Sequence, residues 1–216
     1  MKMNKQIKTI LPLAVIAGLA VTANAAVIQP VSVDNVNGGN LSNRDIGKTI
    51  DGSGLLGAGD ILTQTHSIAV SGQYWISSSG VADGDPAVEL TFDLGVDASY
   101  DIDSVHLWNY SASNGVTRWL KTVDVSFSSD NVTFGNTIDD LTFADVPTNT
   151  EVGVDTVAFS AVSNVRYIKF SNITNGGHAN FVSFSEIRLA SVAPEPSPTP
   201  LLGLGGLPLL HPPPHS

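Results

Sequence analysis

The sequence of 216 residues contains no cysteine and has few basic and aromatic residues. Without cysteine no disulfide can form, so a stable domain must depend on its hydrophobic core. Ten lysine and arginine residues stand against twenty aspartate and glutamate residues, which gives a net charge of −10. This charge repels nucleic acid and anionic membranes, and we therefore expect neither as a general partner.

The motifs of the common enzyme classes are also missing. The sequence has no G-x-S-x-G, H-E-x-x-H, Walker or dinucleotide-binding motif, and it offers no cysteine nucleophile. Neighbouring aspartates such as Asp101 and Asp103 lie in turn-like contexts, where aspartate caps turns. We therefore expect a protein that binds a partner and is not an enzyme.

Residues 1–25 have the composition of a secretory signal peptide. Three lysines precede an apolar stretch over residues 10–21, and Ala23-Asn24-Ala25 fits the small-x-small cleavage pattern. The alternative is a single membrane anchor, but the apolar stretch is shorter than the about 20 residues that a membrane span needs. We expect cleavage after Ala25, which would leave seven basic residues against twenty acidic ones and a net charge of −13.

The last residues, 191–216, contain the triplet Pro194-Glu195-Pro196 followed by a short apolar run over residues 201–210. This arrangement resembles the PEP-CTERM sorting signal, which an exosortase reads in Gram-negative bacteria on proteins bound for the cell surface or extracellular matrix. The tail departs from that signal because Pro208 interrupts the run and no basic cluster closes it. We therefore expect at most transient membrane contact through the tail, and release of the protein.

Residues 26–190 have the pattern of one all-β domain. Apolar residues alternate with polar ones, or gather in β-branched and aromatic runs, between turns rich in asparagine and glycine. The segments with this pattern are 88–94, 105–110, 123–128, 165–170 and 181–189. No segment carries a sustained helical repeat, so the sequence predicts a β-sandwich or jelly roll. A domain of this length can bury about 70% of the surface of its unfolded chain.

Short motifs occur in a fixed order over about residues 45–190. They are Ile50-Asp51-Gly52, Tyr74-Trp75, 88–95, 102–105, Trp108-Asn109-Tyr110 followed by Arg118 and Lys121, 128–131, 165–169 and 185–189. In this order they resemble the discoidin or galactose-binding-like family, which includes coagulation-factor C-type domains and family 32 carbohydrate-binding modules. The resemblance implies a jelly-roll β-sandwich.

Three features depart from the pattern of that family. The segment 52–72 is long and rich in glycine, where the family has a compact loop. Trp119 follows Arg118 at a position where glycine is common. Asn131 takes the place of a turn glycine, which asparagine can do because it tolerates positive φ.

The resemblance implies a structural Ca²⁺ held by Asp51 and Glu186, with Asp60 as an additional carboxylate from the long loop. Carboxylate and carbonyl oxygens are the ligands that Ca²⁺ takes. The alternative from the residues alone is that Asp51 caps a turn and Glu186 forms an ion pair with Arg188 or another base.

Candidate ligand-binding residues combine an aromatic face with groups that donate paired hydrogen bonds to hydroxyls. They are Trp108, Asn109, Arg118, Trp119 and His178. Trp119 is the strongest candidate for an exposed platform, since it follows a turn. Trp108 could instead pack under a loop, and His178 could be an ordinary solvated loop residue, whereas Trp75 is expected in the core.

Two functions are compatible with these features. The first is an exported protein that binds carbohydrate, either an exopolysaccharide or a cell-surface glycan. The second is a structural or adhesive protein of an extracellular matrix or biofilm that has no specific sugar ligand. Aromatic, asparagine and arginine side chains exposed together at one loop cluster would favour the first.

Overall fold

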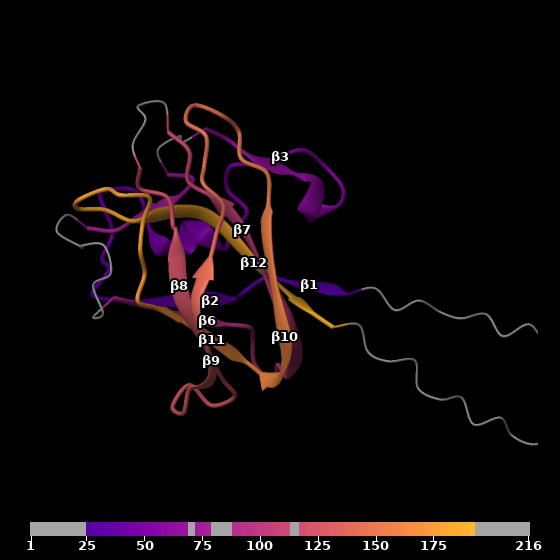
Figure 1. The fold of residues 1–216 in the computed structure, drawn as a ribbon. Helices are drawn as coiled ribbons and strands as arrows, with labels where there is room; N and C mark the ends of the chain where they lie inside the picture. Colours follow the sequence, from indigo (N-terminus) through magenta and orange to yellow (C-terminus); the bar gives the residue numbers. More distant parts are fainter. Residues whose placement is uncertain (1–24, 69–71, 79–87, 113–116, 193–216) are drawn as a thin grey trace, which may run out of the picture. The chain divides into compact units, whose positions relative to one another are not determined.

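A computed structural model describes residues 25–68, 72–78, 88–112 and 117–192 (Figure 1). In this part of the chain the structure consists of strands and two short 3-10 helices, joined by loops. No helix within these ranges has the length and hydrophobicity that a membrane crossing requires. The predicted processing residues Pro194, Glu195 and Pro196 lie outside the described residues.

The strands and 3-10 helices are short, and several are joined by long loops. They are β1 (Ala26–Ile28), β2 (Ser32–Val36), η1 (Ile46–Thr49), β3 (Leu55–Leu56), η2 (Ile61–Thr63), β4 (Thr65–His66), β5 (Trp75–Ile76), β6 (Glu89–Asp93), β7 (Tyr100–Asn109), β8 (Thr122–Ser128), β9 (Gly135–Thr142), β10 (Asp155–Val165), β11 (Tyr167–Ser171) and β12 (Ser183–Ser191).

Two five-stranded antiparallel sheets make up the domain, as the alternating sequence pattern predicted. One sheet has the order β1-β12-β7-β10, with β5 also paired to β12, and the other has the order β2-β6-β11-β8-β9. Strands β3 and β4 form a separate two-stranded ribbon. The two large sheets bury a common core between them, so the fold is a β-sandwich (Figure 1).

The core consists of the inward-facing side chains of both sheets. Phe92 of β6 and Phe170 of β11 meet edge to face with ring centroids 5.2 Å apart, and Trp75 meets Phe184 in the same way at 5.6 Å. Trp75 is fully buried, and its indole N–H donates to the Gly39 carbonyl (2.9 Å). The prediction that Trp75 fills the core is therefore confirmed.

Each of the five segments with a strand pattern overlaps one of β6, β7, β8, β11 and β12. Asn131 has φ of 62°, which confirms the expectation that it replaces a turn glycine. The other strands were not predicted: the short strands β1 to β5, and β9 and β10, the outer strands at one side of the sandwich. Strands β9 and β10 contain register shifts against their neighbours, and such bulges interrupt the two-residue alternation by which strands are identified.

We expect Phe170→Ala to destabilise the domain by about 3–5 kcal/mol, because it leaves a cavity at the centre of the core. Denaturant-induced unfolding measures this loss. Val132→Ala is the control, since the side chain of Val132 is 82% exposed and its truncation should change stability little. Equal stability of the two variants would contradict the position of Phe170 in the core.

Candidate functional site

The segment 117–121 is held between two parts of the chain that lie far from it in sequence. The Gly176 N–H donates to the Trp119 carbonyl (3.0 Å), and the Ser183 N–H donates to the Arg118 carbonyl (2.8 Å). These bonds join the segment to the loop between β11 and β12 and to the start of β12. They bring Arg118 and Trp119 to the loop that carries His178, as the site prediction required.

Asn109 fixes this segment in place and is not itself a ligand-binding residue. Its side chain is 2% exposed. The amide nitrogen donates to the Leu120 carbonyl (2.7 Å), and the amide oxygen accepts from the backbone N–H groups of Leu120 (3.0 Å) and Tyr110 (2.9 Å). Because the amide is both buried and bonded within the protein, the prediction that Asn109 contacts a ligand is wrong.

Trp108 is likewise buried and cannot stack on a ligand. Its side chain has no exposed surface, and the indole N–H donates to the Gln64 carbonyl (2.9 Å), directly after η2. The structure therefore confirms the alternative in which Trp108 packs under a loop, and its prediction as a ligand-binding residue is wrong.

Asn175 organises the loop that carries His178. Its amide oxygen accepts from the N–H groups of Gly177 and His178 (both 2.7 Å), and its amide nitrogen donates to the carbonyls of His178 (2.8 Å) and Phe181 (3.0 Å). His178 is half-buried, and its Nδ1 accepts from the Asn180 N–H (3.1 Å), which leaves Nε2 as the protonated nitrogen. Burial and the nearby charge of Arg118 lower the pKa of His178.

Trp119 packs closely against the same loop. A side-chain carbon built on Gly176 would lie 2.3 Å from the Trp119 ring, so only glycine allows the ring to approach so closely. The Trp119 side chain is partly exposed, and its indole nitrogen has no hydrogen-bond partner among the described residues. A fixed, partly exposed indole is a rigid contact surface for a ligand.

Arginine and aromatic side chains gather beside this loop in a group that we call the loop-end cluster. The guanidinium of Arg118 lies over the Phe181 ring (4.7 Å to the centroid), and that of Arg44 over the Tyr74 ring (5.6 Å). The rings of Tyr74 and Tyr110 lie 4.9 Å apart, and those of His178 and Phe181 lie 5.3 Å apart. The loop-end cluster consists of Arg44, Tyr74, Tyr110, Arg118, His178 and Phe181.

Four members of this cluster were not predicted: Arg44, Tyr74, Tyr110 and Phe181. Tyr74 and Tyr110 belong to the motifs Tyr74-Trp75 and Trp108-Asn109-Tyr110, but nothing local in the sequence distinguishes them as site residues from the tryptophans of the same motifs. Arg44 and Phe181 lie about 140 residues apart in the sequence and belong to no common motif, so only the fold brings them together.

The predicted metal ligand Asp51 is bonded within its own loop. One carboxylate oxygen accepts from the Ser53 N–H (2.8 Å) and the other from the Lys48 ammonium (2.9 Å). Although burial raises the pKa of Asp51, the hydrogen bonds from Ser53 and Lys48 hold it below its ordinary value. Asp51 thus caps a turn and pairs with a base, as the alternative to metal binding stated.

Glu186 is fully buried on β12 and forms an ion pair with Arg188, the other alternative that the sequence offered. Its second carboxylate oxygen accepts from the Gly52 N–H (2.9 Å). Burial raises the pKa of Glu186 to about 7, although the charge of Arg188 and the bond from Gly52 act in the opposite direction.

These carboxylates do not form a calcium cage as they stand. Asp60 caps η2 by accepting from the Leu62 N–H (3.0 Å), and no group of three histidine or acidic residues in the described ranges could hold a metal. Asp51 and Glu186 lie near each other, but Lys48 and Arg188 already supply the positive charge that a cation would bring. Calcium binding through Asp51, Asp60 and Glu186 stays a prediction that these contacts do not favour.

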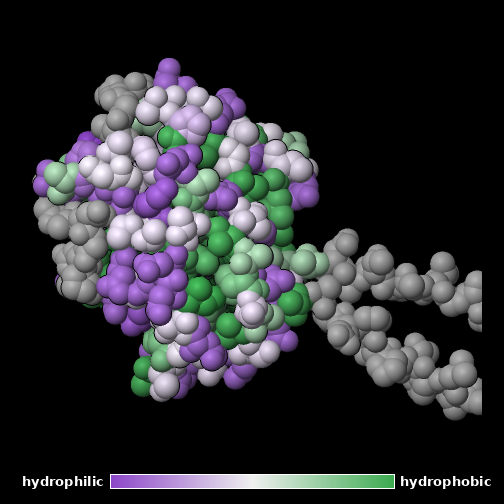
Figure 2. All heavy atoms as spheres, viewed as in Figure 1, coloured by the Kyte–Doolittle hydropathy of each residue, from purple (hydrophilic) through white to green (hydrophobic). Residues whose placement is uncertain are grey.

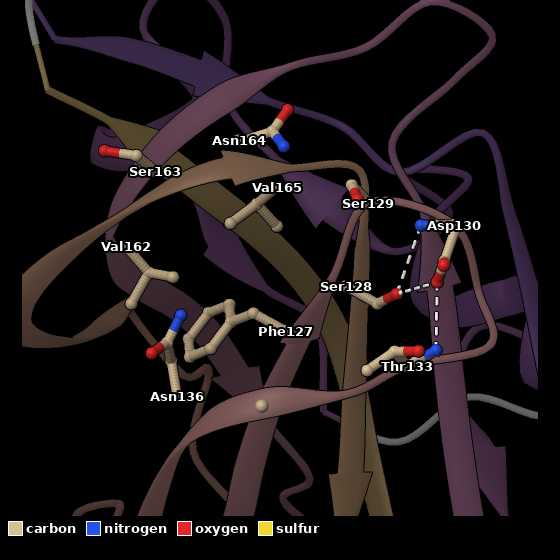
Figure 3. Close-up of a pocket in the computed structure, with 11 residues that line it drawn as sticks. Phe127, Ser128, Ser129, Asp130, Thr133, Asn136, Val162, Ser163, Asn164 and Val165 are labelled. Atoms are coloured by element: carbon tan, nitrogen blue, oxygen red, sulfur yellow. Dashed lines mark hydrogen bonds between the residues drawn. The ribbon is translucent and has the colours of Figure 1, made fainter.

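Apart from the loop-end cluster, a hollow lies between β9 and β10, the outer strands of the two sheets (Figure 3). It has a volume of about 310 Å³ and an apolar floor that includes Phe127 and Val165. Asp130 and the Ser128 hydroxyl lie at its rim, but they bond to each other (2.9 Å) within a turn. Because its acidic side chain is engaged in this turn and no basic side chain lines it, it is a poorer ligand site than the loop-end cluster.

Hydrophobic side chains gather on the face of the domain that carries β10 (Figure 2). The partly buried residues there include Ile138 of β9 and Val157, Phe159 and Val162 of β10, all of which pack against the core. This surface is therefore the exposed margin of the core, between bulged strands that discourage pairing with another sheet.

We expect Glu186→Gln to change the pH dependence of stability. Because the pKa of Glu186 is raised in the folded protein, its contribution to the free energy of unfolding falls as the pH rises from 4.5 to about 7. The stability of the wild type relative to the variant should fall by about 3 kcal/mol over that range. Denaturant unfolding of both proteins across the range measures this difference.

All other titrating groups are the same in the wild type and in Glu186→Gln, so their effects on stability cancel in the difference. A constant difference in stability would contradict a raised pKa at Glu186. A melting temperature that rises with Ca²⁺ in the wild type but not in the variant would instead support the calcium site.

Comparison with solved structures shows the same fold in known binding domains. A family 32 carbohydrate-binding module from Clostridium perfringens NanJ, in complex with galactose, is 16% identical, with a TM-score of 0.51 over 78% of this chain and 100% of that one. A histidine mutant of the lectin-binding domain of lectinolysin, complexed with Lewis b, is 15% identical, with a TM-score of 0.51 over 77% and 95% of the two chains. No curated protein matches the chain.

The family model of the F5/8 type C domain matches residues 56–187. This range covers more than half of the chain and contains most of the β-sandwich, including β5 to β11 and the greater part of β12. It agrees with the discoidin resemblance of the sequence motifs. The protein belongs to the F5/8 type C, or discoidin, domain family.

Proposed function

We propose that this protein is a non-catalytic carbohydrate-binding protein whose site is the loop-end cluster together with Trp119. The observation that carries the proposal is the partly exposed Arg118, which lies on Phe181 beside His178 and has no hydrogen-bond or ion-pair partner among the described residues. Donors without a partner next to aromatic rings are what a hydroxyl-rich ring with an apolar face requires.

Each part of the site has a role in this function. Trp119 and Phe181 offer ring surface for the C–H face of a sugar, and the Nε2–H of neutral His178 can donate to a hydroxyl. The terminal nitrogens of Arg118 can donate a pair of hydrogen bonds to adjacent hydroxyls. Asn109 and Asn175 hold these groups in place through bonds to the backbone, which limits the entropy lost on binding.

The structures with this fold support the assignment, since the NanJ module is bound to galactose and the lectinolysin domain to Lewis b. The alternative is a structural or adhesive matrix protein without a specific sugar ligand. It would suit a loop end whose tryptophans are all buried, whereas Trp119 is partly exposed here.

We expect Phe181→Ala and Trp119→Ala each to weaken glycan binding by at least about tenfold, because each removes a ring from the site. Glycan-array binding followed by titration of the best ligand measures the loss, with and without Ca²⁺. Val132→Ala should bind like the wild type, because Val132 is an exposed residue of the β8–β9 turn. Unchanged binding in both ring variants would contradict this location of the site.

We further propose that the protein acts outside the cell, at the cell surface or in an extracellular matrix. Ala25 is exposed and directly precedes β1, so cleavage after it would leave intact the pairing of β1 with β12. The triplet Pro194-Glu195-Pro196 is the proposed recognition site of an exosortase, in a tail that lacks the basic cluster of the usual signal.

Mass spectrometry of the exported protein tests both ends of the chain. We expect Ala26 as the first residue, and a C-terminal peptide that is retained because the tail is a poor processing signal. An uncleaved N-terminus would contradict the signal peptide. Uniform cleavage near Glu195 would contradict the retention of the tail.

A further inference from the structure

Two basic side chains in the described part of the chain form no ion pair there, and both belong to the loop-end cluster. After the first 25 residues the chain has seven basic residues, all of them described. The five in ion pairs are Lys48, Lys121, Arg166, Lys169 and Arg188. Within the described ranges, Arg44 and Arg118 have no acidic partner, although acidic residues outnumber basic ones nearly three to one.

Both arginines are held by uncharged contacts and still have free donors. The Arg44 Nε donates to the Tyr74 hydroxyl (2.9 Å), and one terminal nitrogen donates to the Ser42 carbonyl (3.2 Å). Arg118 lies on Phe181, and Nε is its only buried nitrogen without a partner among the described residues. The other terminal nitrogen of Arg44 and both of those of Arg118 therefore remain accessible to a ligand.

The charges of the two guanidinium groups both reach Tyr110. The Tyr110 ring lies 4.9 Å from that of Tyr74, which carries Arg44. Phe181, which carries Arg118, packs against the apolar cluster to which both tyrosines belong. Burial and the neighbouring Tyr74 raise the pKa of Tyr110, while the positive charges of Arg118 and Arg44 oppose that rise. Two positive charges that have no ion-pair partner among the described residues, both near one buried tyrosine, attract an anion.

We propose that the loop-end cluster is selective for acidic sugars, and that Arg44 and Arg118 bind the carboxylate of a uronic acid residue. This inference rests on the proposed carbohydrate-binding function and narrows its ligand class. A carboxylate matches the planar fork of a guanidinium and forms charge-assisted hydrogen bonds that are stronger than those to a neutral hydroxyl. The rings of Phe181 and Trp119 remain available for the apolar face of the sugar.

The overall charge makes this selectivity specific to the site. The rest of the surface carries a large excess of carboxylates and repels a polyanion, so binding of an acidic polysaccharide cannot come from general attraction. Any such binding must depend on a local concentration of positive charge. Among the described residues the loop-end cluster supplies it, because the other basic side chains are neutralised by acidic partners.

The test compares polygalacturonate with the same polysaccharide after full methyl esterification, which removes the charge and keeps the sugar ring. We expect the full exported chain to bind the free acid at least about tenfold more tightly than the ester, measured by isothermal titration calorimetry. Arg44→Gln and Arg118→Gln should each remove most of that preference, because each removes charge-assisted donors. Lys169→Gln is the matched control, since it removes an equal charge from an ion pair on β11.

The outcomes separate this inference from the function on which it rests. Equal affinity for acid and ester, lost in Phe181→Ala, would support carbohydrate binding and overturn the selectivity for acidic sugars. An acid preference that survives in both arginine variants, or that falls equally in Lys169→Gln, would overturn the assignment to Arg44 and Arg118. Binding of neither form, nor of any glycan on the array, would overturn both proposals.

Discussion

The buried amide of Asn109 is the constraint on which the geometry of the site depends. Two buried hydrogen bonds join it, at the end of β7, to the backbone of Leu120, and a third comes from the Tyr110 N–H. Loss of these bonds would leave buried donors and acceptors without partners, which costs more than an exposed bond contributes. Because Leu120 is fixed, the backbone of Arg118 and Trp119 is held where it bonds to Ser183 and Gly176, beside the loop that carries His178 and Phe181.

Asn175 likewise holds the loop between β11 and β12 through hydrogen bonds to its backbone. Its four bonds close the loop between β11 and β12 so that His178 and Phe181 face the segment held by Asn109. Gly176 then allows the Trp119 ring to lie directly on the backbone. Two buried asparagines and one glycine thus arrange the side chains of the proposed site.

The charged side chains divide into those that form ion pairs and those that do not. Arg188 pairs with Glu186 in the interior, and Lys48 pairs with Asp51 at the turn beside it, so these contacts do not favour the predicted calcium there. The positive charge that is not used for such pairing remains at the loop-end cluster, on Arg44 and Arg118. This contrast is the basis of our proposal that one end of an acidic domain binds an anionic ligand.

The alternation of apolar and polar residues by itself determined the fold class and the position of five strands, because period-2 burial is a local property of the chain. It did not predict the short strands β1 to β5, nor β9 and β10, whose bulges break the alternation. The composition also indicated which residue types could bind a sugar, but not which of them are accessible. Trp108 and Asn109 have the right chemistry and are buried, whereas Arg44 and Phe181 join the site from opposite ends of the domain sequence. Accessibility depends on which distant segments pack together, and only the tertiary structure decides that.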